Sequence, residues 1–474
     1  MRETVAVQIG QCGNQIGNQF WSTLLKEHET TPDTDSSLSS YFRFEQQRNG
    51  PSVMKARALL IDMECGPLQE TMRGPLASLF DETQFVMDVY GSGNNFAHGN
   101  RVYGPQYRAS FEEGLRKNAE LCDSLQTFVV THSLGGGTGS GVGTYVLNLL
   151  EDMFPEVYRF AVSVFPSEDN DVITSPYNSV LATKELIDHA HCVLPIDNHA
   201  LQSFARLERE QKAKASKKRT AYTTTSCDSD KGFEEMNGVA ARMLCNLTSS
   251  SRFHGDMNVD MNEICTNLVP YPRLPFLMTA LSPYRASSAT ASSMATGGGK
   301  SSSASVPKVT LQRAFGDLLS ANGQISASVP CGDGRTTLAS AFLVRGKVPL
   351  SDFLKCVRSS QRSLKFPSWN PDACKIGMCS TPHPGESFSA LGVFNSTAFG
   401  TVLTRERSRF NQLFRRKAML HHYTEFLEEE DVVLAHDTVS EVIDNYVSID
   451  DGSWRCHKDF MDTRALTDKL FPDF

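Results

Sequence analysis

The sequence lacks several features that would assign it at once to a common functional class. Its 474 residues carry 46 Lys and Arg against 54 Asp and Glu, a formal net charge of −8. This argues against a general nucleic-acid binder, because such proteins are usually basic. No apolar run approaches the roughly 20 residues of a membrane-spanning helix, and the first residues, MRETVAVQIGQCG, have no secretory signal pattern. We therefore expect a protein of the cytoplasm that binds neither nucleic acid nor membrane.

Paired metal ligands and two common nucleotide signatures are also missing. The 12 cysteines form no Cys-x-x-Cys pair, and the nearest two, Cys374 and Cys379, belong to no Cys/His ligand pattern. Reduced thiols are expected rather than disulfides or a zinc site. No GxxxxGK[ST] sequence occurs, which excludes a P-loop, and no glycine segment matches the GxGxxG dinucleotide fingerprint well. A dehydrogenase is therefore a distant alternative.

The N-terminal part does contain a regular alternation of apolar runs and helical patterns. Short apolar runs predict buried strands at 5–9, 58–61, 85–89, 127–130 and 160–165. Helical patterns lie between them at 17–26, 111–122 and 142–153. The alternation predicts an α/β fold built on a parallel sheet. Because the chain is longer than a single hydrophobic core usually grows, about two or three domains are expected.

Two polar segments interrupt the later part of the chain. A charged, basic segment begins at 206 with RLEREQKAKASKKR and continues as TAYTTTSCDSD, and residues 286–305 are almost all small and polar. We expect both to be mobile insertions, because such compositions cannot bury a core. Apolar residues at helical spacing predict a long helix at 233–249 and further helices at 405–423 and 431–446.

Glycine is concentrated in three segments, each placed after a predicted strand. They are GQCGNQIG at 10–17, GSGNNFAHG at 91–99 and GGGTGSG at 135–141. The carboxyl ends of parallel strands meet at one edge of the sheet, where open α/β folds bind ligands. Helices follow the first and third segments, and helix N-termini favour an anion. One such segment would be only a tight turn, but three at one edge predict a phosphate site.

Two acids lie beside this predicted phosphate site. Asp62 and Glu64 stand at the end of the predicted strand in ALLIDMECG. Magnesium bound together with phosphate is usually held by one or two carboxylates, phosphate oxygens and water. Either acid alone is better explained as a solvated strand-end carboxylate, but the neighbouring glycine segments favour a Mg²⁺ site.

Together these segments resemble the tubulin family. The resemblance rests on the three glycine segments, on THSL before the third, and on PYN at 176–178, PIDN at 195–198 and NLVPYPR at 267–273. It extends from Val5 to about Tyr446, and GGGTGSG is highly specific to tubulins and the related FtsZ proteins. It implies a parallel-sheet GTP-binding domain, a central helix, a smaller α/β intermediate domain and a C-terminal helical hairpin. In this chain these would be 1–231 with the insertion at about 206–230, 232–252, 253–388 with the insertion 286–305, and 389–474.

The resemblance implies a site for GTP or GDP with Mg²⁺, in which Asp62 and Glu64 lie on the metal side. The residues that it assigns to the nucleotide are Gln11, Cys12, Gln15, Asn94, Ser133, Gly136, Gly137, Thr138, Gly139, Asp171, Asn198, Phe233 and Asn237.

Within that set, the base end is the most specific part. The amides of Asn198 and Asn237 would recognise guanine, since an amide both donates and accepts hydrogen bonds. Phe233 would stack on the base, a position where tubulins commonly have Tyr. One departure is in TSPYN, where Ser175 stands directly before Pro176 and many tubulins have a glutamate that contacts the ribose. We therefore expect a weaker sugar contact.

Family members complete GTP hydrolysis in trans, with an acid supplied by the adjoining subunit. Asp260 and Glu263, in GDMNVDMNEICTNLVPYPR, fall at the positions of that catalytic loop. A positioned carboxylate can orient a water at the γ-phosphate without being a strong base. The residues by themselves are better explained as surface helix carboxylates, so this role depends on the resemblance.

Within the family, the sequence is most similar to epsilon-tubulin, with delta-tubulin as the alternative. LIDME, FPEVYRF and EDNDVITSPYNSVLATKEL carry this resemblance, and the last residues, RALTDKLFPDF, lack the acidic tail of α- and β-tubulin. It implies a cytoskeletal protein of the centrosome, centrioles and basal bodies that acts in triplet microtubules. Its expected partners are other tubulins, through longitudinal contacts, and centriolar or basal-body proteins.

Two functions remain open. One is a polymer-forming GTPase with weak turnover completed in trans, which Glu263 favours. The other is a nucleotide-stabilised partner of tubulins that does not polymerise and turns over little GTP. The insertion 286–305 favours this second function, because it stands where tubulins make lateral contacts and ordering its backbone would cost about 1–2 kcal/mol per residue.

Overall fold

The fold is described from a computed structural model of the chain. It describes residues 2–29, 38–46, 52–167, 172–215, 229–253, 255, 257–282, 308–326, 329–330 and 334–454. Among the helices of these residues, none is long and apolar enough to cross a bilayer.

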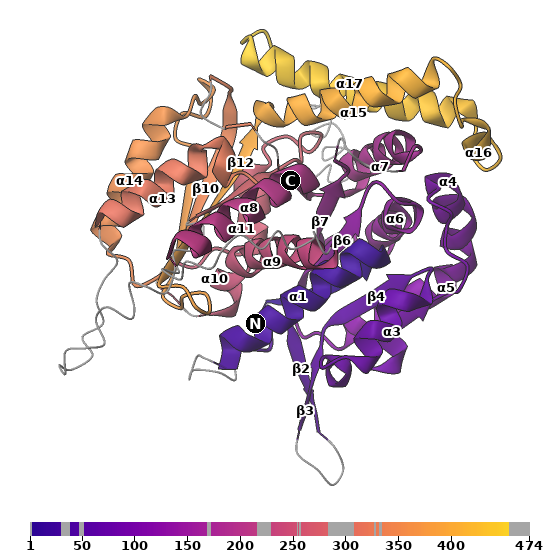
Figure 1. Cartoon of the computed structure of the whole chain (residues 1–474), viewed down its shortest axis with the longest axis horizontal. Helices are drawn as coiled ribbons and strands as arrows, with labels where there is room; N and C mark the ends of the chain where they lie inside the picture. Colours follow the sequence, from indigo (N-terminus) through magenta and orange to yellow (C-terminus); the bar gives the residue numbers. More distant parts are fainter. Residues whose placement is uncertain are drawn as a thin grey trace, which may run out of the picture.

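A six-stranded parallel sheet forms the N-terminal part, in the order β5-β4-β1-β6-β7-β8 (Figure 1). Its strands are β1 (Glu3–Ile9), β4 (Ala58–Asp62), β5 (Phe85–Met87), β6 (Leu125–Ser133), β7 (Tyr158–Phe165) and β8 (Cys192–Asp197). The predicted α/β class and the five predicted strands are confirmed. The edge strand β8 was not predicted, because Pro195 interrupts its apolar run; a proline is tolerated in a strand at the edge of a sheet.

Helices cover both faces of this sheet. On one face lie α1 (Gly10–Glu29), α3 (Cys65–Arg73), α8 (Asn198–Ala215) and α9 (Ser229–Leu247). On the other lie α5 (Gly104–Glu120), α6 (Gly143–Met153) and α7 (Ser175–His189). Side chains of a strand alternate between faces, so Val5 and Val7 of β1 pack in the second cluster and Ala6 in the first. Because both faces are buried, the strands are almost continuously apolar.

A second, four-stranded sheet forms the middle of the chain, in the order β11-β10-β12-β9. Its strands are β9 (Met278–Ser282), β10 (Thr337–Gly346), β11 (Cys374–Cys379) and β12 (Phe388–Ser396). One face packs on α13 (Lys308–Leu319) and α14 (Leu350–Ser363), and the other on α9 and α11 (Met261–Leu268), which follows the short α10 (Ser249–Arg252). Since β12 pairs with β10 along its whole length, we propose that the domain boundary expected at 388 lies after Ser396.

Short elements complete the two sheet regions. The strands β2 (Phe42–Glu45) and β3 (Val53–Ala56) pair as a hairpin that projects from the first sheet (Figure 1). The one-turn helix α4 (Phe96–His98) continues through a π-helical turn, Gly99–Tyr103, into α5.

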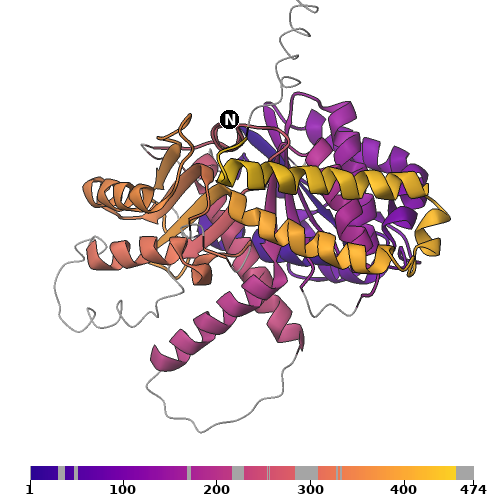
Figure 2. The same cartoon turned by 90° about the horizontal axis from the view of Figure 1, so that it is seen from above.

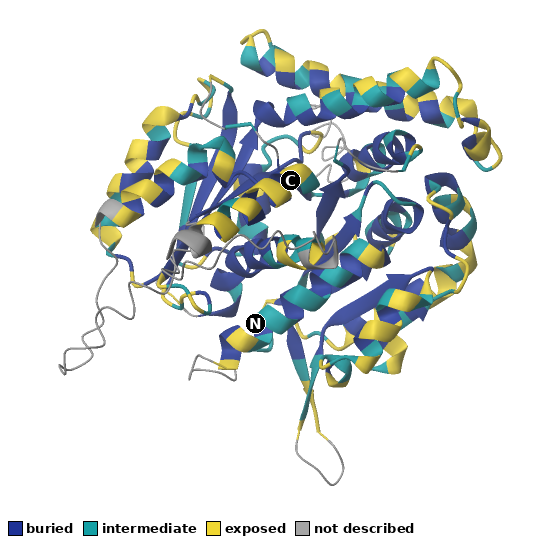
Figure 3. Cartoon of the chain, in the orientation of Figure 1, coloured by how far each residue is buried: buried dark blue, intermediate teal, exposed yellow. Residues whose placement is uncertain are grey.

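Two long helices lie across the outside of the molecule. They are α15 (Gly400–Phe414) and α17 (Glu429–Asp450), which lie side by side over α7 and are joined through α16 (His421–Thr424) (Figures 1 and 2). The prediction of one helix over 405–423 is wrong, because Lys417 (φ 48°) and Met419 (φ 59°) adopt the left-handed conformation. Figure 3 shows exposed residues along both outer helices, whereas the strands of the two sheets are largely buried.

The basic segment expected to be a mobile insertion from 206 begins as ordered helix. α8 extends to Ala215, and Glu208 pairs with Arg242 of α9 at 2.7 Å between buried side chains. The expectation is therefore wrong for 206–215. Residues 216–228 and 286–305 lie outside the described residues.

Backbone hydrogen bonds join the two sheet regions. The amide of Val193 in β8 donates to Pro275 O at 2.8 Å, and the amide of Leu277 donates to Val193 O at 2.8 Å. Further along β8, the amide of Asp197 donates to Ile325 O at 3.0 Å. The outer edge of β8 is therefore occupied by the chain of the second region.

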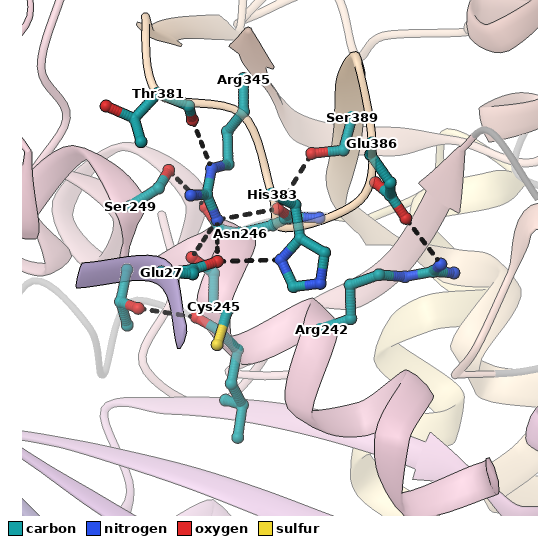
Figure 4. A network of polar contacts seen from close by, with 12 residues as sticks. Glu27, Arg242, Cys245, Asn246, Ser249, Arg345, Thr381, His383, Glu386 and Ser389 are labelled. Carbon is teal, nitrogen blue, oxygen red and sulfur yellow. Dashed lines mark hydrogen bonds and ion pairs between the residues drawn. The ribbon is translucent and has the colours of Figure 1, made fainter. Parts of the chain in front are cut away.

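A buried charge cluster lies where the C-terminal ends of α1 and α9 meet the second sheet (Figure 4). The Glu27 carboxylate pairs with Arg252 at 2.6 Å, with Arg345 at 2.7 Å and with His383 Nδ1 at 2.8 Å. Arg345 Nη1 also donates to Asn246 Oδ1 at 3.3 Å. Burial alone raises the pKa of Glu27, but Arg252, Arg345 and the His383 hydrogen bond outweigh it and hold that pKa well below its usual range. This cluster therefore ties both helices to the second sheet.

Candidate nucleotide-binding site

A cavity of about 900 Å³ opens at the carboxyl ends of the parallel strands, between the N-terminal ends of α1 and α9. Its position is the one at which open α/β sheets bind ligands, and its volume suits a ligand of nucleotide size. The residues that line it are Gln11, Cys12, Gln15, Asn18, Gln19, Glu70, Asn94, Ser133, Gly135, Gly136, Val164, Pro166, Val172, Asn198, Phe233, Glu234, Met236 and Asn237.

The lining brings together nine of the residues that the family resemblance assigned to a nucleotide. They are Gln11, Cys12, Gln15, Asn94, Ser133, Gly136, Asn198, Phe233 and Asn237. Gly137, Thr138 and Gly139 continue the third glycine segment but do not line the cavity. Asp171 lies outside the described residues.

The first and third glycine segments pack directly against each other. Gly10 adopts a left-handed φ of 74°, and a Cβ there would lie 3.2 Å from the amide of Gly139. A side chain at Gly13 would collide with the carbonyl of Thr131 in β6. Glycine is therefore required here for the chain to turn from β1 into α1 while lying against the third segment.

A buried histidine of β6, His132, holds the third glycine segment in place. The His132 ring contacts Gly139 O through Nδ1 at 2.8 Å and Ser163 Oγ through Nε2 at 2.9 Å. Burial lowers the pKa of His132 to about 4, although the bond to Gly139 opposes this. The ring is therefore neutral near pH 7, and because a carbonyl can only accept, Nδ1 donates to Gly139 and Nε2 accepts from Ser163.

The lining is suited to phosphate groups through the main chain rather than through cations. Among the lining residues that the structure describes, none is Lys or Arg. Successive glycine amides and a helix N-terminus can bind an anion without a cationic side chain. At the opposite end of the lining, Asn198 begins α8, Asn237 lies on α9, and the Phe233 ring is 53% exposed.

The two acids assigned to a metal do not line the cavity but stand at the carboxyl end of β4, the strand next to β1. Asp62 is buried, and its Oδ1 accepts the amide of Glu64 at 3.3 Å, whereas Oδ2 is buried without a hydrogen-bond partner among the described residues. Burial raises the pKa of Asp62 to about 7, and the nearby charge of Glu64 adds to this. A buried carboxylate oxygen left unpaired fits a cation or its bound water, so these residues are compatible with Mg²⁺.

Asp260 and Glu263 lie away from this cavity. They follow α9 and α10, and the 19 residues of α9 span about 28 Å from the cavity towards the charge cluster. Glu263, in the first turn of α11, pairs with Lys375 of β11 at 2.6 Å, and Asp260 pairs with Arg2. Neither residue lines the cavity of its own chain.

Comparison with known proteins decides the family. Residues 3–206 match the family described as "Tubulin/FtsZ family, GTPase domain". The tubulin epsilon chain of Homo sapiens is 41% identical over 95% of this chain and 96% of its own length, and that of Mus musculus is 40% identical over the same shares. The chain belongs to the tubulin family.

Two beta chains are less similar to this chain than these epsilon chains are. A tubulin beta chain of Pneumocystis carinii is 31% identical over 94% of this chain and 96% of its own length. The tubulin GTPase domain implies guanine nucleotide binding, and the cavity lies between that domain and α9.

Sequence reasoning missed half of the lining of this tubulin site. The additional residues are Asn18, Gln19, Glu70, Gly135, Val164, Pro166, Val172, Glu234 and Met236. Helical spacing could have found Asn18 and Gln19, which lie one turn after Gln15 on α1. Glu70 carries no such signal, since it lies within α3 with no glycine segment beside it.

Proposed function

We propose that this chain is a GTP-binding cytoskeletal protein that organises triplet microtubules at centrioles and basal bodies. The greater identity to epsilon chains than to a beta chain supports the choice within the family. Its proposed location is the cytoplasm and the cytoskeleton, at the centrosome, centrioles and basal bodies. Its proposed partners are other tubulins, along the longitudinal direction, and centriolar proteins.

The observation that carries the nucleotide proposal is the convergence of two kinds of residue on one cavity. Gln11, Asn94 and Gly136 come from the three glycine segments, and Asn198 and Asn237 come from α8 and α9. The first group suits phosphates and the second suits a guanine edge. Phe233 offers a ring face for stacking on the base, and Asp171 is proposed to contact the ribose.

Magnesium bound with the phosphates would neutralise charge on them, and Asp62 and Glu64 are proposed to hold it. Asp62 contributes its unpaired buried oxygen. The exposed Glu64 follows two residues later at the start of α3, and it would bind the ion through a water.

Hydrolysis, where it occurs, is proposed to need a neighbouring subunit. Phosphoryl transfer depends mostly on positioning and electrostatic stabilisation. Glu263 lies on α11, which follows the end of α9 that points away from the cavity, so it is too far to serve the cavity of its own chain. The neighbour's Glu263 would orient the water, with Asp260 beside it. The non-polymerising alternative is favoured by one observation: Lys375 already pairs with Glu263 within the single chain.

The first test is the nucleotide content of the purified chain. We expect bound GTP or GDP, and GTP should displace a fluorescent guanine nucleotide far better than ATP does. Protein that is folded but free of guanine nucleotide, and that binds none when it is added, would contradict the proposed function. A fluorescently tagged chain should mark centrioles, and a uniform cytoplasmic signal would contradict that part.

The test of hydrolysis in trans uses Glu263→Ala. Nucleotide affinity should be unchanged, whereas phosphate release that rises with subunit concentration should fall about 10²–10⁴-fold, as expected on losing a positioned acid–base group. Glu112→Ala, which removes an exposed carboxylate paired with Arg108, is the control. Wild-type release that is equally fast per subunit at all dilutions would rule out catalysis in trans. No release from a chain with bound GTP would favour the non-polymerising alternative.

A further inference from the structure

Asn178, at the start of α7, joins two loops of the nucleotide cavity. Its side chain is fully buried, and Nδ2 donates to Asn94 O at 2.8 Å and to Gly135 O at 2.9 Å. Its Oδ1 accepts the amide of Phe96 at 2.9 Å. Asn94 and Gly135 both line the cavity, so one amide fixes the backbone of the second and third glycine segments relative to each other.

The same side-chain amide also binds Tyr423, which comes from the segment between the two outer helices. The Tyr423 hydroxyl donates to Asn178 Oδ1 at 2.6 Å, with Thr174 O at 3.2 Å, and the ring is fully buried. Tyr423 belongs to α16, which joins the two outer helices and lies next to α4 (Figure 1). The adjacent residue adds a second contact, since Asn95 Nδ2 donates to His422 O at 2.8 Å.

This arrangement matters because the held backbone is strained. Asn94 adopts a φ of 53°, a left-handed conformation that a non-glycine residue adopts only at some cost in free energy. Asn178 donates to the carbonyl of Asn94 and accepts the amide of Phe96, so both bonds hold the backbone at and directly after Asn94. A loop that is already held in its binding conformation loses less entropy when a ligand binds.

We propose that Asn178 and Tyr423 are positioning residues that couple the outer helices α15 and α17 to the phosphate end of the cavity. The proposal rests on the proposed function, because it takes the ligand of these loops to be a guanine nucleotide. Neither side chain lines the cavity; both act through the backbone of Asn94 and Gly135. A displacement of the outer helices would thereby change nucleotide affinity.

The chain supplies a matched control for this proposal. Tyr177 is also fully buried, and its ring lies 5.0 Å from that of Tyr423. Its hydroxyl donates to Ala418 O at 3.0 Å and not to a loop of the cavity. Tyr423→Phe and Tyr177→Phe therefore each remove one buried hydroxyl from the same aromatic pair, but only the first touches the proposed coupling.

The experiment measures GTP affinity and the rate of exchange of bound labelled GTP, together with thermal unfolding. We expect Tyr423→Phe to weaken GTP binding about three- to tenfold, the loss of one buried hydrogen bond, mainly through faster release. Tyr177→Phe should stay within twofold of the wild type. Asn178→Asp has the same shape but turns an oxygen toward two carbonyl oxygens, so it should weaken binding more than about tenfold.

A double-mutant comparison tests whether the two residues act as one unit. In the Asn178→Ala background, Tyr423→Phe should cause little further loss of affinity, because Asn178 Oδ1, through which the Tyr423 hydroxyl reaches the cavity loops, is already gone. Equal affinities for Tyr423→Phe, Tyr177→Phe and wild type would overturn the proposal, as would equal losses in the two tyrosine variants. If Tyr423→Phe is not recovered folded, Asn178→Asp against Tyr177→Phe decides in the same way. A wild-type chain that binds no guanine nucleotide would instead overturn the proposed function.

Discussion

The two ends of the helix pair α1 and α9 both gather polar residues, but they treat them in opposite ways. At the N-terminal end, Gln11, Gln15 and Asn237 surround an open cavity of about 900 Å³. At the C-terminal end, Glu27 is closed in by two arginines and a histidine (Figure 4). Glu27 and Arg252 are each at most 1% exposed.

The open end is suited to receiving a ligand, whereas the closed end stabilises the fold. Buried charges must be paired within the chain, since an unpaired one costs several kcal/mol. Polar groups around a cavity can instead be satisfied by water or by a ligand, so they contribute to affinity rather than to folding. Substitutions at the cluster should therefore change stability, and substitutions at the cavity should change affinity.

The largest effect is expected for Glu27→Ala. It leaves Arg252 and Arg345 buried without their carboxylate, which should lower the free energy of unfolding by about 3–5 kcal/mol. Chemical denaturation of the nucleotide-free chain measures this. Glu113→Ala, whose carboxylate is exposed on α5, should change stability little. Equal stabilities for the two variants would remove the structural role of the cluster.

A smaller effect concerns pH and involves one histidine at each end. Burial lowers the pKa of both His28 and His132 to about 4, and for His28 the charge of Arg252 adds to this. The unfolded chain, with an ordinary histidine pKa near 6.5, binds more protons than the folded chain below that pH. The stabilisation is complete above about pH 6.5 and is lost as the pH falls toward about 4.

His28→Phe and His132→Asn measure this contribution at each end. Between pH 7 and pH 5, each variant should lose about 2 kcal/mol less stability than the wild type loses. Denaturant unfolding at the two pH values gives the comparison. Only His132→Asn should also weaken GTP binding, because only His132 contacts a glycine segment. The same pH dependence in all three proteins would contradict the assignment.

Asn237→Ala tests the other half of the comparison, namely that a residue lining the cavity contributes to affinity and not to stability. GTP affinity should fall about tenfold, because a guanine edge would be left unpaired, while unfolding of the nucleotide-free chain stays as in the wild type. A competition titration with GTP and ATP provides the measurement. Equal affinity of the wild type for the two nucleotides would show that Asn237 does not select the base.

The smallest effect is expected for removal of 216–228, with a short linker between α8 and α9. The polar composition of this segment cannot contribute to a core, so GTP affinity should be unchanged. The deletion must start after Ala215, because Glu208 pairs with Arg242. Loss of bound nucleotide from the shortened chain would show that the segment supports the cavity.

Much of the parallel sheet could be predicted, because strands that are buried on both faces have nearly continuous apolar sequences. The glycine segments were equally visible, since a turn such as that at Gly10 admits no other residue without strain. The break after Phe414 was not visible, because the residues that adopt left-handed conformations there are Lys417 and Met419 rather than glycine.

The polar contacts of Glu27 and of Asn178 could not be predicted from the sequence for a different reason. Glu27 and His383 are 356 residues apart, and Asn178 and Tyr423 are 245 apart. No periodicity or motif connects residues at such separations, so only the packed fold brings them together. Among the cavity residues, all of those on the glycine segments except Gly135 were found, whereas Glu70 was missed because an acid within a helix is usually solvated.

The covered edge of β8 has a consequence for how copies of this chain can meet. A strand edge with free amide and carbonyl groups is a template for another strand, and short or covered edges prevent such addition. β8 is covered along Val193 and Asp197 by the second region, β9 is bonded by Ile325, and β5 has only three residues. The amide of Met378 in β11 donates to Met257 O, which protects that edge as well. Among the described residues, assembly by extension of either of these two sheets is therefore discouraged, which favours contacts between neighbouring molecules through helices, loops and side chains.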